Sequence, residues 1–188
     1  MRRRPFMQGI FASGAVALQS WSRPSIAMEE SFNSAPFTVA ELSQAIKNSE
    51  ISASAVAEIV IARVEASSAL EAIIAFEADR LRKNAKAADR ALREGETLGP
   101  LHGVPIMLKD NIEAVGFTNT GGTPALSSYR PSRNAAVTQK LIDAGAIIAG
   151  KANMDELAGG GSTNNPTFGR TRNPYNIEHI PGGSSGGS

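Results

Sequence analysis

Apolar residues recur at helical spacing in the first half of the chain. Thr38–Glu41 has the form of a capping box that opens a helix. Helices are also expected over 53–67 and 80–94, where apolar and polar residues alternate in the helical manner. The short apolar segment 72–76 between them predicts a strand. This half contains no obvious chemistry, so we interpret it as a scaffold or a docking segment.

A lysine follows a continuous apolar run in the second half. Val104–Leu108 is typical of a buried strand, and Lys109 stands at its carboxyl end. Lysine is rarely placed beside so much apolar sequence unless it is paired or functional. Two interpretations stay open from this stretch. Lys109 is either an active-site base, or a side chain that pairs with an acid such as Asp110 or points to solvent.

A helix and a second strand follow. The segment 135–143 predicts a helix with Val137, Leu141 and Ile142 on one side, and Gly145 marks its end. The apolar segment 146–149 predicts a strand. Strand, helix and strand in this order are typical of an α/β fold with a parallel sheet.

Composition narrows the function classes. The 188 residues suffice for one domain, with 41% hydrophobic and 20% charged residues. The absence of cysteine excludes disulfides and thiolate metal sites, and two histidines argue against a His-rich site. We therefore expect no metal and no cofactor. A net charge of +1 does not indicate a basic surface that would bind nucleic acid.

The first 27 residues contain four arginines and no acidic residue. They predict a signal peptide over 1–27, cleaved before Met28, because an apolar segment too short to span a bilayer follows Arg2–Arg4. The order Arg3-Arg4-Pro5-Phe6 resembles a twin-arginine signal, which predicts export to the bacterial periplasm. An organelle transit peptide, a disordered terminus and a cytoplasmic protein are the alternatives.

Two loops consist almost entirely of small residues. The first is Gly159–Asn164, and the second is Pro181–Ser188, with four glycines and three serines. Such residues let the backbone pass close to other groups and adopt angles that a Cβ forbids. A flexible linker or a disordered tail is the competing interpretation of the second loop. The approach to it, 171–176, is not of low complexity.

Two other catalytic patterns are rejected. Gly145–Lys151 fits the first seven places of a phosphate-binding loop, but Ala152 stands where Ser or Thr is required, and the segment resembles a strand. No Gly-x-Ser-x-Gly elbow occurs. His102 and His179 lie beside Gly or Pro turns, where a structural hydrogen bond is the commoner role. The catalytic pattern that remains is a serine with lysine as its base.

Five motifs together resemble the amidase-signature family, which includes amidotransferase A-type subunits and exported amidases. In chain order they are Leu101–Ile106, Lys109–Asn111, Gly150–Glu156, Thr171–Pro174 and Pro181–Ser188. The resemblance covers about residues 38–188. It implies an α/β fold with helices around a mixed central sheet, of which only the N-terminal part is present.

The resemblance also implies a Ser–cis-Ser–Lys triad that cleaves amide bonds through an acyl-enzyme. Lys109 matches the base, and Ser184 matches the bridging serine that follows a cis peptide bond. Gly161 and Ser162 become candidates for substrate binding. The residues expected to shape the loop around Ser184 are Gly182, Gly183, Gly186 and Gly187.

The family's nucleophilic serine lies further along the chain than Ser188, so Ser185 and Ser188 are not proposed for that role. We expect three segments: the signal 1–27, a helical segment 28–98 and the start of the catalytic core 99–188. A small-molecule amide is the expected partner, without nucleic acid or a stable membrane span, and the oligomeric state stays open. The alternative functions are a non-catalytic remnant or binding module, and an amidotransferase A-type subunit.

Overall fold

The computed structural model describes residues 38–188. The predicted signal peptide, its twin-arginine pair and the cleavage before Met28 lie outside these residues. Within the described range, no helix combines the length and the apolar composition that crossing a bilayer requires.

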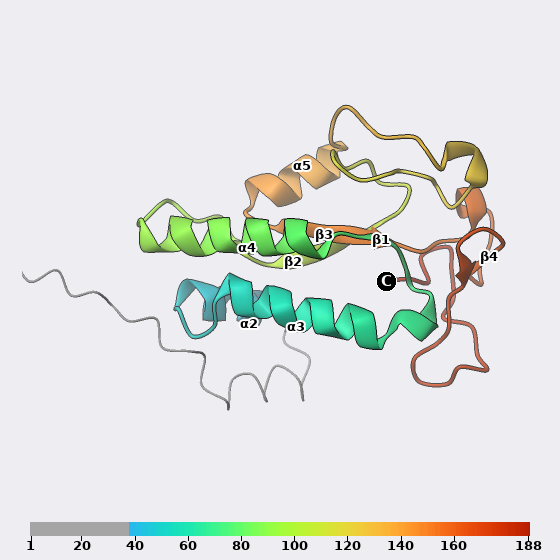
Figure 1. The fold of residues 1–188 in the computed structure, drawn as a ribbon, viewed down its shortest axis with the longest axis horizontal. Coiled ribbons are helices and arrows are strands. Elements are labelled where there is room, and N and C mark those ends of the chain that lie inside the picture. Colours follow the sequence, from blue (N-terminus) through green and yellow to red (C-terminus); the bar gives the residue numbers. More distant parts are fainter. Residues whose placement is uncertain (1–37) are drawn as a thin grey trace, which may run out of the picture.

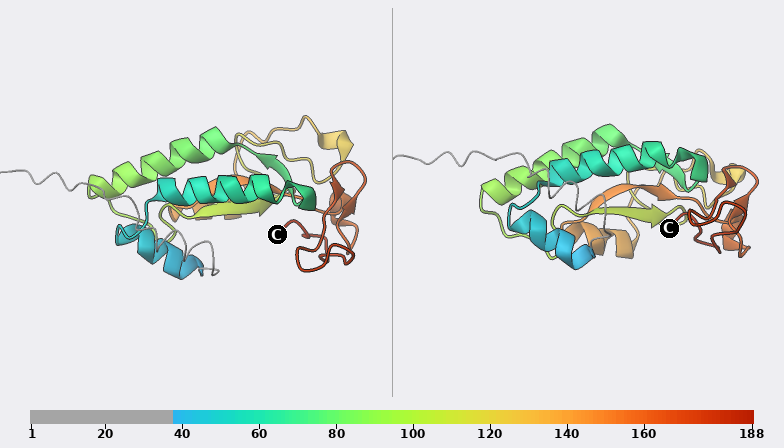
Figure 2. Two further views of the ribbon diagram at one scale, coloured as in Figure 1. Left: turned by 60° about the horizontal axis from the view of Figure 1, so that its bottom comes forward. Right: turned by 90° about the horizontal axis from the view of Figure 1, so that it is seen from below.

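Within residues 38–188, three α-helices precede the family motifs. They are α2 (Val39–Lys47), α3 (Ala53–Ala66) and α4 (Ala78–Arg93). The predicted capping box is confirmed: Glu41 N donates to Thr38 Oγ1 over 3.2 Å, and Thr38 N donates to the Glu41 carboxylate over 2.8 Å. Helices α3 and α4 lie side by side across one face of a sheet (Figure 2). The helices predicted over 53–67 and 80–94 are therefore present as α3 and α4.

The sheet has three strands: β1 (Ile73–Phe76), β2 (Pro105–Lys109) and β3 (Ile147–Ala152). Their order is β1-β3-β2, with β2 parallel and β1 antiparallel to the central β3. This confirms the expected mixed sheet. It also confirms that the segment containing Gly150 and Lys151 is a strand and not a phosphate-binding loop.

The remaining elements are short. Helix α5 (Ala136–Asp143) connects β2 to β3 on the face of the sheet opposite α3 and α4 (Figure 2). The others are the 3-10 turns η1 (Ser68–Leu70), η2 (Pro124–Leu126) and η3 (Glu156–Ala158), and the two-residue strands β4 (Asn164–Asn165) and β5 (Gly169–Arg170).

Apolar side chains of β3 enter two cores because successive residues of a strand point to opposite faces. Ile147 and Ala149 join the core formed with α2, α3 and α4. Ile148 joins a smaller core with Leu108 and Phe117. The central strand is therefore buried on both sides, as a continuous apolar run predicts.

The apolar side predicted for α5 is wrong in part. Val137 and Ile142 are 49% and 39% exposed, whereas Thr138 is fully buried. Thr138 Oγ1 donates to the Glu113 carbonyl over 2.7 Å, and Leu141 packs against the smaller core. At 3.6 residues per turn the buried face is centred between Thr138 and Leu141, so Val137 and Ile142 flank it.

A buried carboxylate joins α4 to the start of α3. Asp89 is 5% exposed and accepts hydrogen bonds from Ala53 N over 2.7 Å and from Ser54 N over 3.1 Å. The first N–H groups of a helix have no partner within it, so a carboxylate there stabilises the helix start. Asp89 thereby adds a polar connection to the packing of the two helices.

We expect Asp89→Ala to lower the free energy of unfolding by about 2 kcal/mol, because buried donors lose their acceptor. Asp79→Ala, on the exposed side of α4, is the matched control and should change it by less than about 0.5 kcal/mol. Urea denaturation of both variants measures the difference. Equal stability of the two variants would contradict this role for Asp89.

Candidate active site

The motifs that contain Lys109 and Ser184 meet where β2 and β3 end. Lys109 is the last residue of β2 and is in register with Ala152, the last residue of β3. The loops that follow β3 gather at this end of the molecule, at the right in Figure 1. Carboxyl ends of parallel strands meet at one edge of a sheet, which brings Lys109 and the final loop together.

Lys109 and Ser184 are in direct contact. Lys109 Nζ lies 2.6 Å from Ser184 Oγ, although the two residues are 75 positions apart. Both side chains are half-buried. The Gly183–Ser184 peptide bond is cis, as the resemblance implied. The alternative pairing of Lys109 with Asp110 is wrong, because the Asp110 carboxylate faces Lys151 instead.

The residues after β3 hold the backbone of the Ser184 loop. Asp155 N donates to the Ser184 carbonyl over 3.1 Å, and Gly187 N donates to the Asn153 carbonyl over 3.1 Å. Asn153 and Asp155 are both buried. The final loop is thus fixed along the extension of the central strand and is not a free tail.

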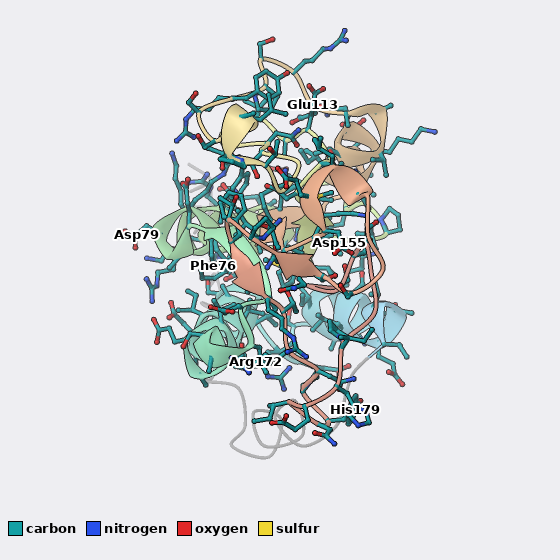
Figure 3. All side chains as sticks on the ribbon, turned by 90° about the vertical axis from the view of Figure 1, so that its right-hand side faces the viewer. Phe76, Asp79, Glu113, Asp155, Arg172 and His179 are labelled. Atoms are coloured by element: carbon teal, nitrogen blue, oxygen red, sulfur yellow. The ribbon has the colours of Figure 1, made fainter. Side chains whose placement is uncertain are left out.

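Asp155 also joins the two small-residue loops. Its carboxylate accepts a hydrogen bond from Ser162 N over 3.2 Å. A Cβ on Gly183 would lie 2.3 Å from Asp155 Oδ2, so this close approach requires glycine. Asp155 lies near the middle of this end of the molecule, with Arg172 and His179 towards its margin (Figure 3). Gly161 is exposed and Ser162 half-buried in the same loop.

A second lysine is completely buried beneath the segment that follows β2. Lys151 Nζ donates to the carbonyls of Asp110 over 3.0 Å and Ile112 over 2.8 Å, and to Asn119 Oδ1 over 3.0 Å. Its nitrogen lies 3.8 Å from Asp110 Oδ1. Burial lowers the pKa of the Lys151 ammonium, and the Asp110 carboxylate opposes that shift.

The other oxygen of Asp110 is hydrogen-bonded to Thr120, which lies further along the same segment. Asp110 Oδ2 accepts hydrogen bonds from Thr120 N over 3.0 Å and from the Thr120 hydroxyl. Asp110 Oδ1 has no hydrogen-bond partner among residues 38–188, so its charge is balanced by the Lys151 ammonium. Ion pair and hydrogen bonds together fix the chain immediately after Lys109.

The two histidines stay outside this arrangement. His102 is buried, and its Nε2 lies 3.1 Å from the Ala88 carbonyl, which is the structural role expected of it. His179 is exposed. Across the described residues, no three His, Asp or Glu side chains come together as metal ligands would.

Comparison with known proteins identifies the family. The family model described as Amidase matches residues 55–188. The chain belongs to the amidase family. The A-type subunit of the glutamyl-tRNA(Gln) amidotransferase of Lachnospira eligens is 42% identical over 153 residues, covering 81% of this chain and 32% of that protein.

Solved structures of amidases share the fold. The peptide amidase of Stenotrophomonas maltophilia is 37% identical with a TM-score of 0.74, over 82% of this chain and 33% of that one. A bacterial aryl acylamidase of the amidase-signature family is 33% identical with a TM-score of 0.76, over 80% and 32%. The chain therefore spans about a third of the length of its amidase relatives.

Sequence reasoning missed the roles of Lys151 and Asp110 in this amidase chain. Both stand in the family motifs, but the motifs alone give neither of them a role. One signal was available: Lys151 interrupts an apolar strand, as Lys109 ends one. A lysine in such a position requires partners, and here they are carbonyls of the neighbouring loop.

We expect Lys151→Met to lower the free energy of unfolding by about 3–5 kcal/mol, because it leaves the buried Asp110 carboxylate uncompensated. Lys83→Met, at an exposed position of α4, is the control and should change stability little. Chemical denaturation compares the two. A small loss in Lys151→Met would show that the buried contacts do not hold the segment after β2.

Proposed function

We propose that this chain supplies the base and the bridging serine of an enzyme that hydrolyses amide bonds. The observation that carries the proposal is the 2.6 Å contact between Lys109 Nζ and Ser184 Oγ. Two groups that pass a proton must lie within hydrogen-bond reach, and this pair does. Membership of the amidase family supports the same reaction class.

In the proposed mechanism, the side-chain nitrogen of Lys109 accepts the proton of Ser184 Oγ. Ser184 in turn takes the proton of a nucleophilic serine, whose oxygen attacks the amide carbonyl carbon. The carbon–nitrogen bond then breaks, the amine leaves with a proton returned through Ser184, and an acyl ester remains. Water hydrolyses that ester and releases the acid. Ser184 therefore acts as a relay.

The nucleophile is proposed to come from residues outside the 188 of this sequence. The relatives are about three times as long as the region they share with this chain, which supports further catalytic segments. Ser185 is exposed and has no hydrogen bond to Lys109. Gly161 and Ser162 stay candidates for the substrate-facing loop, because Asp155 holds that loop against Gly183.

A second candidate function is that of an amidotransferase A-type subunit. It is favoured by the 42% identity to such a protein, against 37% to the peptide amidase. In that case the amide would be presented within an assembly of several chains. A non-catalytic remnant or binding module is the remaining alternative. Export through the predicted signal 1–27 stays a prediction, and the relatives do not support it.

We expect Lys109→Ala and Ser184→Ala each to reduce kcat/KM for amide hydrolysis by about a thousandfold or more, since each removes a member of the proton relay. The assay uses the protein expressed from its complete reading frame. Lys83→Ala and Ser127→Ala, at exposed positions, are the matched controls. Activity within about tenfold of wild type in either site variant would exclude the proposed role.

The two candidate functions are separated by substrate. Hydrolysis of free aryl or peptide amides by the protein alone supports a hydrolase. Glutamine hydrolysis that requires partner subunits supports an amidotransferase. Reading the DNA after the Ser188 codon shows whether a Gly-Gly-Ser segment follows in frame. A stop codon there, with no hydrolysis of either substrate class, would support the non-catalytic alternative.

A further inference from the structure

One hydroxyl group bridges the loop on both sides of Ser184. Thr163 Oγ1 donates to the Gly182 carbonyl over 2.9 Å and accepts from Gly186 N over 2.9 Å. Gly182 and Gly186 each stand two residues from Ser184, one before it and one after it. The hydroxyl therefore sets the separation of the two ends of the turn that carries the serine.

Thr163 is itself held firmly. Its side chain is fully buried, and its φ of +53° lies in the left-handed region, which β-branched residues rarely adopt. The Thr163 carbonyl accepts from Thr171 N over 3.0 Å. Thr171 is in turn buried, and its hydroxyl donates to the Glu71 carbonyl over 2.9 Å. A residue kept in a sparsely populated conformation by its surroundings is an indication of a functional constraint.

The absence of a Cβ at Gly186 leaves space for this hydroxyl. A Cβ on Gly186 would lie 2.3 Å from Thr163 Oγ1, so a larger residue at Gly186 would push the hydroxyl away. Asp155 N fixes the Ser184 carbonyl, whereas the Ser184 side chain is hydrogen-bonded to Lys109. Asp155 and Asn153 hold the backbone at Ser184 and Gly187, and Thr163 holds Gly182 and Gly186 on either side of Ser184.

We propose that Thr163 is a positioning residue, which keeps Ser184 Oγ within hydrogen-bond distance of Lys109 without contacting the substrate. This inference rests on the proposed function. Removal of the hydroxyl leaves the Gly182 carbonyl and the Gly186 N–H without their partner, and the turn relaxes. A displacement of about 1 Å at a catalytic group can reduce the rate about a hundredfold.

The test compares Thr163→Val, which removes the hydroxyl and keeps the branched shape, with Thr163→Ser, which keeps the hydroxyl. Thr138→Val is the matched control, because Thr138 is also fully buried and donates to a backbone carbonyl, that of Glu113. In the protein from its complete reading frame, Thr163→Val should lower kcat about a hundredfold with KM nearly unchanged. Thr163→Ser and Thr138→Val should stay within about threefold of wild type.

A hydrogen-exchange measurement separates this proposal from the proposed function. The Gly186 amide should exchange at least about tenfold faster in Thr163→Val than in wild type, but not in Thr163→Ser or Thr138→Val. If the wild type hydrolyses no amide, the proposed function fails while the exchange rate still tests the bridge. If Thr163→Val does not fold, Thr163→Ala compared with Thr163→Ser gives the same readouts.

Three results would overturn the inference. Unchanged Gly186 exchange in Thr163→Val would show that the hydroxyl does not hold the turn. Equal losses of kcat in the Val and Ser variants would show that packing, and not the hydroxyl, is what matters at this position. A loss of unfolding stability alone, as in Thr138→Val, with kcat unchanged would likewise reduce Thr163 to a structural residue.

Discussion

The buried ammonium of Lys151 is the interaction on which the arrangement of this site depends. Lys151 belongs to β3, but its hydrogen-bond partners are carbonyls of the segment that follows β2. That segment forms no regular strand or helix that would satisfy its carbonyls. The Lys151 ammonium donates hydrogen bonds to them instead. A buried charge is stable only when it is paired, and Asp110 provides the opposite charge. Lys109 is therefore anchored on both sides, by β2 before it and by this network after it.

The central strand positions the other half of the site as well. Beyond the end of β3, Asn153 accepts from Gly187 N and Asp155 N donates to the Ser184 carbonyl. Because β2 and β3 are parallel, Lys109 and the extension of β3 arrive at the same edge. Residues 75 positions apart thus meet through one strand, which holds the loop after β2 and the loop that carries Ser184.

Periodicity could predict the strands, because it is a local property of the sequence. The mixed sheet and the contact between Lys109 and Ser184 followed only from the family resemblance, which the motifs carry. Sequence patterns could not predict which acid pairs with which lysine. Asp110 is adjacent to Lys109 in sequence, yet successive residues at a strand end point in opposite directions, and Asp110 faces Lys151. The buried face of α5 differs from its prediction for a similar reason. Thr138 can be buried only because a carbonyl from another segment accepts a hydrogen bond from its hydroxyl.

Thr163 shows most clearly what sequence patterns cannot predict. Its proposed role requires a left-handed backbone angle and two partners 19 and 23 residues away. A loop of glycine and serine has few side chains to pack and loses much conformational entropy on ordering. Each hydrogen bond contributes only about 1 kcal/mol to stability, so several are needed to hold such a turn in one conformation. The surrounding Asn153, Asp155 and Thr163 each contribute at least one, from buried positions. The small residues of the final loop are thus compatible with a rigid site because larger, buried neighbours fix its backbone.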